Sequence, residues 1–325
     1  MNGRVLVTDT VFGDIEFEQE VLGGEGLDAV LAPSSDEQTL TELAGEADAV
    51  MVCFAQITRP VVEAAARAGV PVISRTGIGY DNIDLQAAAE AGITVTYVPD
   101  YCLDEVADHT MALVLAHARG IVRGVDLLRE DGWGVADKGL RRLRGRRLAL
   151  VGVGQIGRRV AERARAFGLE VTAHDPYLED WSTLPAERAE TLEDALAEAD
   201  FVSLHAPLTD ATHHVIDAAA IAAMRRAPLV VNTARGPLVD LDAALEGLDS
   251  GKLGGLAVDV TEPEPLPDGH PLRTHPKAVV TPHMAFYSVE AQEELRRRSC
   301  EEVLRALKGQ EPDSPVPLPS VAGGS

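Results

Sequence analysis

The sequence is poor in lysine, in aromatic residues and in cysteine. Only four of its 29 basic residues are lysines, aromatic residues make up 4% of the chain, and its three cysteines, Cys53, Cys102 and Cys300, are widely spaced. Such spacing forms neither a disulfide framework nor a zinc knuckle, so we expect buried thiols in a reducing cytoplasm and no metal site.

Two further absences bear on where the protein works. The sequence has no run of about 18 apolar residues, the length that a helix needs to cross a membrane. The N-terminus also lacks a basic segment followed by an apolar one, which is the pattern of a signal peptide. We therefore expect a cytoplasmic protein that has no membrane partner.

Acidic residues are in large excess. The chain has 52 Asp and Glu against 29 Lys and Arg, a formal net charge of −23. Such a surface repels nucleic acid, so no nucleic-acid partner is expected. Acid excess with little lysine indicates a halophilic protein, whose self-repulsion is screened by a salt-rich cytoplasm. The alternative is a merely acidic protein from an arginine-favouring genome.

A length of 325 residues is enough for two domains. The first hundred residues alternate between short apolar runs and helical patterns, such as 59–68 and 84–91, each followed by a glycine. Apolar strands separated by helices predict a doubly wound parallel sheet. The predicted strands of this region are 4–8, 28–32, 48–52, 70–74 and 93–97.

A glycine-rich motif organises the second half of the chain. The apolar run 148–151 leads into Gly152-Val-Gly154-Gln155-Ile156-Gly157, a helical pattern follows to Phe167, and a second strand ends at Asp175. Strand, glycine turn, helix, strand and terminal acid form the dinucleotide-binding unit. The glycines permit the turn, the approach of a pyrophosphate and the packing of helix on strand, and the helix N-terminus attracts the phosphates. An ordinary strand-to-helix turn is the alternative.

Asp175 predicts which dinucleotide binds. It can accept hydrogen bonds from a ribose 2′-hydroxyl and would repel a 2′-phosphate, so we expect NAD rather than NADP. Six strands, the number in a full Rossmann sheet, are predicted in this half of the chain: 148–151, 170–174, 201–205, 229–232, 256–259 and 278–281.

Three other segments complete the predicted organisation. A long amphipathic helix spans 104–119, and the arginine- and glycine-rich segment 119–147, which includes Trp133, is interpreted as an arm between domains and a candidate homodimer contact. A last helix covers 291–308. Residues from 311 onward are a tail of Pro, Gly and Ser.

Three predicted strand ends carry residues that can do chemistry. Arg235, Glu264 and His283 each follow a different strand, and ligands of doubly wound sheets bind outside the carboxyl ends of the strands. Arg235 can bind a carboxylate with two hydrogen bonds, His283 can move a proton near neutral pH, and Glu264 can orient the histidine and favour its charged form. Taken singly, each is also compatible with a surface turn, a solvated loop or a structural histidine.

The loop Gly77-Ile78-Gly79 carries a weaker signal. It joins a predicted strand to a predicted helix, and its backbone amides can hold a small anion such as a carboxylate. A simple turn explains the same spacing.

Motifs along nearly the whole chain resemble the D-isomer-specific 2-hydroxyacid dehydrogenase family, most closely its branch of C-terminal binding proteins, which are transcriptional corepressors. The matching motifs are Asp81-Asn-Ile-Asp84, Gly152-Val-Gly-Gln-Ile-Gly157, His174-Asp-Pro-Tyr177, Thr212-His-His214, Val231-Asn-Thr-Ala-Arg-Gly236, Asp259-Val-Thr-Glu-Pro-Glu-Pro265 and Thr281-Pro-His-Met-Ala-Phe-Tyr-Ser288.

The resemblance implies an α/β fold of two doubly wound parallel-sheet domains. A Rossmann NAD domain, residues 102–287, is expected to be inserted into a flavodoxin-like substrate domain formed by 1–101 and 288–325. The resemblance further implies an NAD-dependent enzyme that reduces a 2-oxo acid, such as glyoxylate or hydroxypyruvate, to the D-2-hydroxy acid. The alternative implied by the corepressor branch is a binding protein that senses NAD(H).

The resemblance also assigns roles to residues. Arg235 is expected to bind substrate, with Glu264 and His283 as the proton-handling pair. Substrate contacts are expected from Arg75, from Gly77, Ile78 and Gly79, and from Phe286, which stands where that branch commonly has tryptophan. Cofactor contacts are expected from the glycine motif with Gln155 and Ile156, and from Asp175, His205, Ala206, Pro207, Thr212, Thr233, Ala234 and Asp259.

Overall fold

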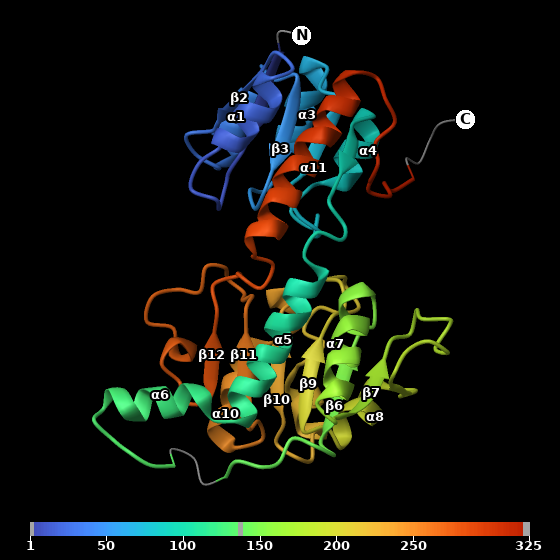
Figure 1. Ribbon diagram of the computed structural model, residues 1–325. Coiled ribbons are helices and arrows are strands. Elements are labelled where there is room, and N and C mark those ends of the chain that lie inside the picture. The colour runs from blue at the N-terminus through green and yellow to red at the C-terminus, as the bar shows by residue number, and fades with distance from the viewer. Residues whose placement is uncertain (1–2, 136–138, 321–325) are drawn as a thin grey trace. The chain divides into compact units, whose positions relative to one another are not determined.

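The computed structural model describes residues 3–135 and 139–320. Contacts within it divide the chain into two compact units, one formed by residues 1–101 with 288–325 and the other by 102–287. Each unit is built on one parallel sheet flanked by helices (Figure 1). This arrangement confirms the predicted α/β fold class.

The first unit has a five-stranded sheet in the order β2-β1-β3-β4-β5, all parallel. This is the flavodoxin-like order, in which the chain reverses direction across the sheet after its second strand. The strands are β1 (Gly3–Val7), β2 (Leu27–Leu31), β3 (Ala49–Val52), β4 (Val72–Arg75) and β5 (Thr94–Thr96).

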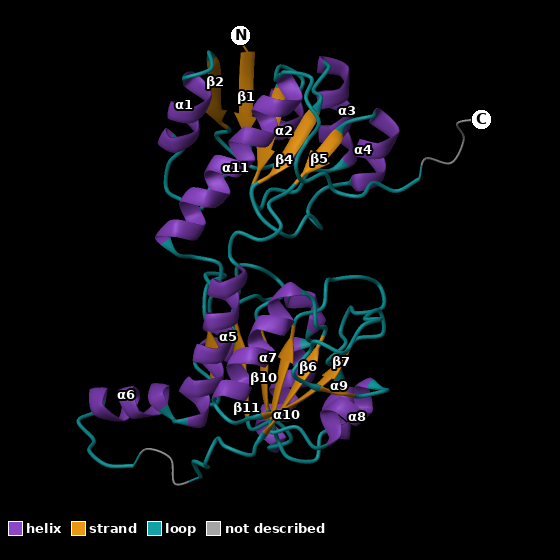
Figure 2. Cartoon of the chain, turned by 45° about the vertical axis from the view of Figure 1, so that its right-hand side comes forward, coloured by secondary structure: helices purple, strands orange, loops and turns teal. Residues whose placement is uncertain are grey.

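Alternation along β1 explains why helices cover both faces of this sheet. Val5 and Val7 join a buried cluster with α1 and α11, whereas Leu6 points to the opposite cluster, formed with α2, α3 and α4. The strands therefore lie between two helical layers (Figure 2). The helices are α1 (Glu16–Gly23), α2 (Glu37–Ala44), α3 (Arg59–Ala68), α4 (Leu85–Ala91) and α11 (Val289–Leu307).

The C-terminal segment is more than the tail that its composition suggests. Val316 donates a backbone hydrogen bond to the carbonyl of Val95 at 2.8 Å, and its side chain is buried in the core of the first unit. The buried carboxylate of Glu302 on α11 accepts the amides of Asp313 and Ser314. The segment thus pairs with the edge of the sheet at β5, a non-local contact that local composition does not reveal.

The described residues of the second unit form a sheet of seven strands rather than the predicted six, in the order β12-β11-β10-β9-β6-β7-β8. The additional strand, β8, has only two residues, Glu187 and Arg188, and both are exposed. The prediction missed it because two charged residues carry no apolar pattern. The remaining strands are β6 (Arg147–Val151), β7 (Glu170–His174), β9 (Phe201–Leu204), β10 (Leu229–Asn232), β11 (Gly255–Val258) and β12 (Ala278–Val280).

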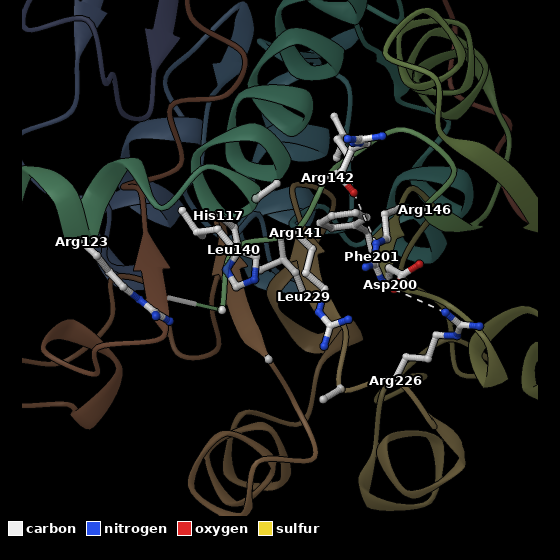
Figure 3. A pocket seen from close by; sticks show the side chains of 15 residues that line it. His117, Arg123, Leu140, Arg141, Arg142, Arg146, Asp200, Phe201, Arg226 and Leu229 are labelled. Carbon is white, nitrogen blue, oxygen red and sulfur yellow. Dashed lines mark hydrogen bonds and ion pairs between the residues drawn. The ribbon is translucent and has the colours of Figure 1, made fainter. Parts of the chain in front are cut away.

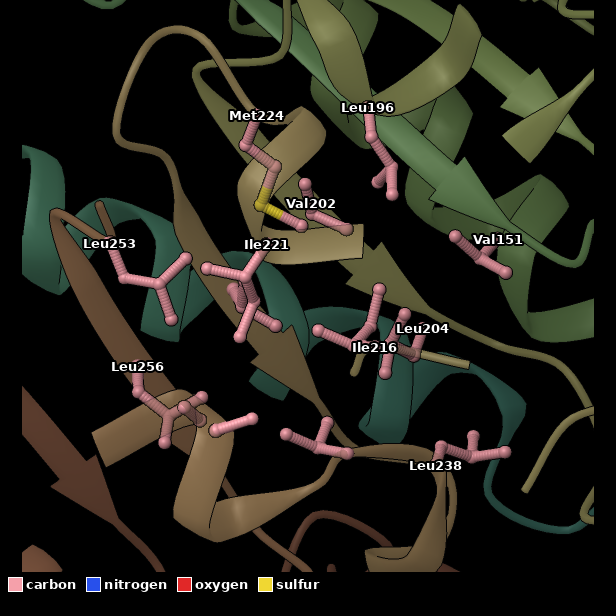
Figure 4. Close-up of a cluster of buried hydrophobic side chains, with 14 of the residues drawn as sticks. Val151, Leu196, Val202, Leu204, Ile216, Ile221, Met224, Leu238, Leu253 and Leu256 are labelled. Carbon is pink, nitrogen blue, oxygen red and sulfur yellow. The ribbon is translucent and has the colours of Figure 1, made fainter. Parts of the chain in front are cut away.

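Two apolar cores hold this sheet between its helices. Val151, Leu204 and Val258 pack on one face against α8, α9 and α10 (Figure 4). Residues of the opposite register, such as Leu150 and Val231, pack against α5 and α7. The helices are α5 (Leu103–Ala118), α7 (Gln155–Ala166), α8 (Leu192–Ala197), α9 (Ala218–Ala223) and α10 (Leu241–Ser250).

The predicted arm begins with a helix that its unit does not bury. Helix α6 (Ile121–Arg129) has no buried residue, and it projects from the second unit in both ribbon views. Ile121, Val125 and Leu128 are 53%, 43% and 59% exposed, and Trp133 is 94% exposed. Across the described residues, no helix combines the length and apolarity that crossing a membrane requires.

Candidate active site

The turn between β6 and α7 has the geometry of a phosphate-binding loop. Gly152 has a φ of 85°, and a Cβ there would lie 2.6 Å from the backbone nitrogen of Ala206. A Cβ on Gly157 would lie 2.7 Å from the carbonyl oxygen of Gly152, so the first turn of α7 packs directly on the strand end. A Cβ on Gly154 would meet no atom within 4 Å, so the space beside this residue is open. A pyrophosphate can therefore approach the backbone at Gly154.

Helix α7 begins at this turn, and its N-terminus supplies a partial positive charge. Gln155 and Ile156 form its first turn, and neither is buried. The unpaired amides of a helix N-terminus carry partial positive charge and attract phosphate groups. The predicted glycine motif thus folds into one continuous cradle for a dinucleotide.

Asp175 stands beside the cradle, one residue beyond β7. Its Oδ2 accepts the amide of Val153 at 2.9 Å, and its Oδ1 accepts the amide of Tyr177 at 3.0 Å. Each carboxylate oxygen can accept a further hydrogen bond. Asp175 is therefore fixed in place and can still bind ribose hydroxyl groups.

The loop that follows β9 forms another wall of the cradle. Its Ala206 backbone lies against Gly152, and the hydroxyl of Thr212 donates to the carbonyl of Pro207 at 2.7 Å, which closes the loop on itself. His205 lies 2.9 Å from the Ser203 hydroxyl, and burial lowers the pKa of His205 to about 4. The His205 ring is therefore neutral at pH 7 and adds no charge near the phosphates.

Asn232 organises the turn that carries Arg235. Its Nδ2 donates to the carbonyl of Arg235 at 2.7 Å, and its Oδ1 accepts the amide of Ala234 at 3.0 Å. The guanidinium of Arg235 donates to the carbonyl of Ala234 at 2.7 Å and stays partly exposed. This turn holds a cation at the carboxyl edge of the sheet.

Glu264 and His283 are brought together across 19 residues. The Oε1 of Glu264 lies 2.5 Å from Nδ1 of His283, and the side chains are 37% and 26% exposed. His283 has a φ of 48°, a left-handed conformation that costs energy in a non-glycine residue. Such a conformation persists only where the surrounding structure fixes it.

Asp259 fixes the turn from inside the sheet edge. Its carboxylate accepts the amides of Met284 and Ala285 at 3.0 and 2.8 Å, and its carbonyl accepts the amide of His283 at 2.8 Å. The Thr281 hydroxyl donates to the same carboxylate. The sequence predicts Asp259 only as a cofactor contact, whereas the structure shows a buried carboxylate that holds the His283 turn.

Helix α5 contributes two residues that sequence reasoning missed. His109 Nε2 lies 3.1 Å from the Thr281 hydroxyl, and the Thr110 hydroxyl lies 2.9 Å from that of Thr233. These contacts join α5 to the strand ends that carry His283 and Arg235. The only signal in the sequence is polar residues on an otherwise apolar helix, which does not identify their partners.

The predicted substrate loop of the first unit is also shaped around an arginine. Gly77 has a φ of 154°, and the buried guanidinium of Arg75 occupies the position that a Cβ of Gly77 would need. The guanidinium also lies 5.5 Å from the centre of the Phe54 ring. The amide of Gly77 donates to the carbonyl of Arg75 at 2.9 Å, and Ile78 and Gly79 follow as partly exposed residues. The loop therefore lies next to a buried cation.

Phe286, the residue proposed to shape the substrate pocket, lies near the histidine. The ring centres of Phe286 and His283 are 6.3 Å apart at an interplanar angle of 78°. This edge-to-face contact places an aromatic side chain next to His283.

The second unit combines a doubly wound parallel sheet with a glycine turn, the architecture of dinucleotide-binding domains. Residues 111–285 match the family model described as D-isomer specific 2-hydroxyacid dehydrogenase, NAD binding domain. The chain belongs to the D-isomer-specific 2-hydroxyacid dehydrogenase family. It is an NAD-dependent dehydrogenase, and NAD is its cofactor.

Two curated relatives and a solved structure illustrate the similarity. The chain is 36% identical over 98% of its length to the D-3-phosphoglycerate dehydrogenase of Methanocaldococcus jannaschii, but it spans only 60% of that protein. It is also 36% identical to the hydroxypyruvate reductase of Thermotoga maritima, over 94% of this chain and 98% of the relative. A structure of D-lactate dehydrogenase from Aquifex aeolicus, complexed with NAD and lactic acid, superposes with a TM-score of 0.84 at 28% identity, covering 94% of this chain and 96% of that one.

Proposed function

We propose that this enzyme reversibly reduces a small 2-oxo acid to the corresponding D-2-hydroxy acid. The observation that supports the proposal is the contact of 2.5 Å between Glu264 and His283. The pair stands at the carboxyl edge of the sheet that also carries Arg235 and the glycine turn. A carboxylate-oriented imidazole beside a dinucleotide site is suited to moving a proton together with a hydride.

In this proposal Arg235 binds the substrate carboxylate and stabilises the negative charge that develops on the C2 oxygen. When bound, NADH supplies the hydride that C2 accepts. Glu264 accepts the Nδ1–H of His283, which leaves the Nε2–H directed to the substrate oxygen. His283 gives that proton to the oxygen during reduction and takes it back during oxidation, so the hydroxyl group forms without free hydroxide or acid.

The remaining substrate contacts are part of the same proposal. The Gly77-Ile78-Gly79 loop with the nearby Arg75 suits a carboxylate, and Phe286 suits the substrate side chain. D-stereochemistry follows from the family and from no single residue. The domain roles also stay proposals, with the 102–287 unit binding NAD and the other unit contributing to substrate binding.

The substrate is best identified by a screen. Glyoxylate, hydroxypyruvate, pyruvate and a branched 2-oxo acid would each be offered with NADH, at low salt and in molar KCl. We expect turnover with at least one small acid and its loss in His283→Ala, by about 100-fold or more given the usual contribution of a general acid. Phe286→Ala should change the ratio of catalytic efficiencies between small and bulky acids.

The same screen separates the enzyme from the alternative that the corepressor branch implies. An NAD(H)-sensing binding protein would bind NADH, which fluorescence of the bound cofactor detects, yet would turn over none of the acids. Membership of that branch stays a prediction, and the intact set of Arg235, Glu264 and His283 favours an enzyme.

We also propose a homodimer formed through the 119–147 arm. Helix α6 exposes Ile121, Val125 and Leu128, and a second copy of the same helix would cover these apolar side chains symmetrically. Light scattering should give twice the chain mass for the native protein and the single mass for Val125→Asp/Leu128→Asp. A monomeric native protein would refute this proposal.

A halophilic, cytoplasmic enzyme is proposed on the net charge of −23 and the scarcity of lysine. Both features suit a solvent in which salt screens repulsion between carboxylates. The salt dependence that tests the halophilic part is set out in the Discussion.

A further inference from the structure

Two features of the second unit have no role in the proposed reaction. The first is a pocket of about 420 Å³, shown in Figure 3. Because residues of the 119–147 arm form much of its lining, this pocket adjoins the proposed homodimer contact and supports no separate site. The second feature is a cluster of side chains that can bind a metal ion, His213, His214 and Glu262.

Three loops at the carboxyl ends of β9, β10 and β11 bring this cluster together. The amide of His214 donates to the carbonyl of Pro237 at 2.8 Å, which ties the loop after β9 to the turn after β10. A Cβ on Gly236 would collide with the carbonyl of Thr261, so the loop after β11 packs on the same turn. Glu262 is the next residue of that loop. The backbone therefore holds the histidines and the glutamate near one another.

His214 directs its two ring nitrogens to different carboxylates. Its Nε2 lies 3.7 Å from Oε2 of Glu262, and its Nδ1 lies 4.0 Å from Oδ2 of Asp240. Both separations are longer than a hydrogen bond. Two ligand atoms of one tetrahedral zinc ion lie roughly 3.4 Å apart, given metal–ligand distances of about 2.0 to 2.2 Å. The separation between His214 and Glu262 therefore suits an ion held between them.

Asp240 is placed to orient His214 from behind. Its Oδ1 accepts the amides of Asp242 and Ala243 at the start of α10, at 3.1 and 3.0 Å, so the carboxylate is fixed while Oδ2 faces His214. A histidine that binds a metal through one nitrogen usually donates its other N–H to a carboxylate, which holds the ring in place. A shift of about 1 Å would complete this hydrogen bond.

His213 supplies the second imidazole. Its ring stacks on that of His214, with 4.0 Å between the ring centres and 27° between the planes, so both rings lie on the same side of the chain. Its ligand atom lies within 4.8 Å of those of His214 and Glu262. A metal ion lies in the plane of each imidazole that binds it, so the stacked rings must open. His213 is exposed on a loop, where its ring can rotate.

The ligand set selects the metal. Two imidazole nitrogens and one carboxylate oxygen form a typical zinc site with three protein ligands, in which water takes the fourth position. Magnesium and calcium ions prefer sets of oxygen ligands. The net charge of −23 attracts cations to the surface. All three cysteines are buried, so their thiols do not compete for the ion.

We propose that His213, His214 and Glu262 bind one zinc ion, with Asp240 orienting His214. The ion would join the loop after β9, which forms a wall of the cofactor cradle, to the loop after β11, which carries Glu264. It would thereby stabilise the sheet edge at which the cofactor binds. The cysteine spacing predicts no metal site, but these ligands are not cysteines and meet only in the folded chain. The proposal does not depend on the substrate of the enzyme.

Calorimetric titration of the untagged full chain with zinc chloride tests the site, after dialysis against a chelator. Excess magnesium chloride occupies exposed carboxylates, which bind hard cations. We expect one zinc ion per chain and a melting temperature that rises with free zinc, because the ion binds the folded chain. His213→Gln/His214→Asn should weaken binding at least tenfold and remove that rise.

Asparagine is the replacement at position 214 because His214 has a φ of 51°, and asparagine tolerates this left-handed conformation. Equal melting temperatures of the double variant and the native protein without zinc would show that the variant is folded. If the double variant melts at a lower temperature, His213→Gln alone provides the test, since this side chain is exposed. It should also weaken zinc binding at least tenfold.

Two control variants separate the site from other histidines. His275 lies 3.4 Å from the carboxylate of Asp249, so His275→Gln removes a histidine from a different carboxylate pair. His283→Ala removes the histidine of the candidate active site. Both should bind zinc as the native protein does. Weakening in His275→Gln equal to that in the double variant, or binding that His283→Ala abolishes and the double variant retains, would overturn the proposal. Absence of saturable binding to the native protein would overturn it as well.

Discussion

The hydroxyl of Thr281 donates a hydrogen bond to the carboxylate of Asp259, with 2.5 Å between the two oxygens. A hydroxyl has one proton, so the oxygen of Thr281 can only accept from His109, whose Nε2 lies 3.1 Å away. His109 must therefore carry its proton on Nε2. A chain of hydrogen bonds runs from α5 through Thr281 to Asp259, which fixes the backbone of His283.

This chain of bonds predicts the behaviour of His109 variants. His109→Leu removes the donor. Loss of this hydrogen bond should raise the activation free energy by about 1 to 1.5 kcal/mol, which corresponds to roughly a tenfold lower kcat. The KM for NADH should change little, because the glycine cradle is untouched. His109→Gln restores an N–H at the position of Nε2 and should recover most of the rate.

Steady-state kinetics with thermal melting measure the effect. Equal kcat in the native enzyme and His109→Leu would show that α5 does not position His283. A native protein that turns over no 2-oxo acid would instead contradict the proposed function.

A second prediction concerns Glu264. Its Oε1 lies 2.5 Å from Nδ1 of His283 and orients the ring for proton transfer. Glu264→Leu removes this acceptor, so kcat should fall by about tenfold or more, whereas Glu264→Gln keeps an acceptor and should retain more of the rate. The KM for NADH should change little in both variants. Equal kcat in the native enzyme and Glu264→Leu would argue against this proton relay.

A third prediction concerns the choice of cofactor. Asp175→Ser removes the negative charge that a 2′-phosphate would meet, so kcat/KM should fall for NADH and rise for NADPH. Asp180→Ser removes the same charge from an exposed position in the segment after β7 and serves as the control. If Asp180→Ser changes the NADH-to-NADPH ratio as much as Asp175→Ser does, the preference does not reside in Asp175.

A buried ion pair in the first unit predicts a large effect on stability. Arg296 of α11 donates to both carboxylate oxygens of Glu18 on α1, at 2.8 and 2.6 Å, and the side chains are 7% and 4% exposed. Hydrogen bonding to Glu18 raises the pKa of Arg296, so the pair stays charged. Arg296→Met leaves a buried carboxylate unpaired and should cost about 3 to 5 kcal/mol of unfolding free energy.

Arg297 provides the matched comparison for the ion pair. It pairs with Glu301 at 2.6 Å on the exposed side of the same helix, where both side chains are nearly half exposed. Arg297→Met should cost less than about 1 kcal/mol, because solvent screens the pair. Urea unfolding measures both values, and similar losses would mean that burial of the Glu18 pair is unimportant.

A fifth prediction concerns salt. Repulsion among the 52 acidic residues should destabilise the folded state at low ionic strength, so the melting temperature should rise between 0.05 M and molar KCl. Activity should rise over the same range. A melting temperature that is independent of salt would support the alternative of an acidic protein from an arginine-favouring genome.

The sequence by itself determined the local structure. Helix α3 occurs at Arg59–Ala68, the range that its pattern predicts, because its apolar spacing and the glycine that follows are properties of neighbouring residues. The glycine motif could also be recognised from the sequence. Any side chain at Gly152 or Gly157 would collide with backbone atoms, so glycine at these positions indicates that two backbone segments approach closely.

The tertiary structure decided which distant residues meet. His109 contacts Thr281 across 172 positions of the sequence. Val316, near the C-terminus, pairs with Val95, which lies in the N-terminal part of the sequence. Strand β8 exists only because β7 offers a free edge, since Glu187 and Arg188 have no strand pattern of their own. Local propensity and periodicity describe neighbours in the chain, whereas these contacts depend on how whole elements pack against one another, which only the folded chain specifies.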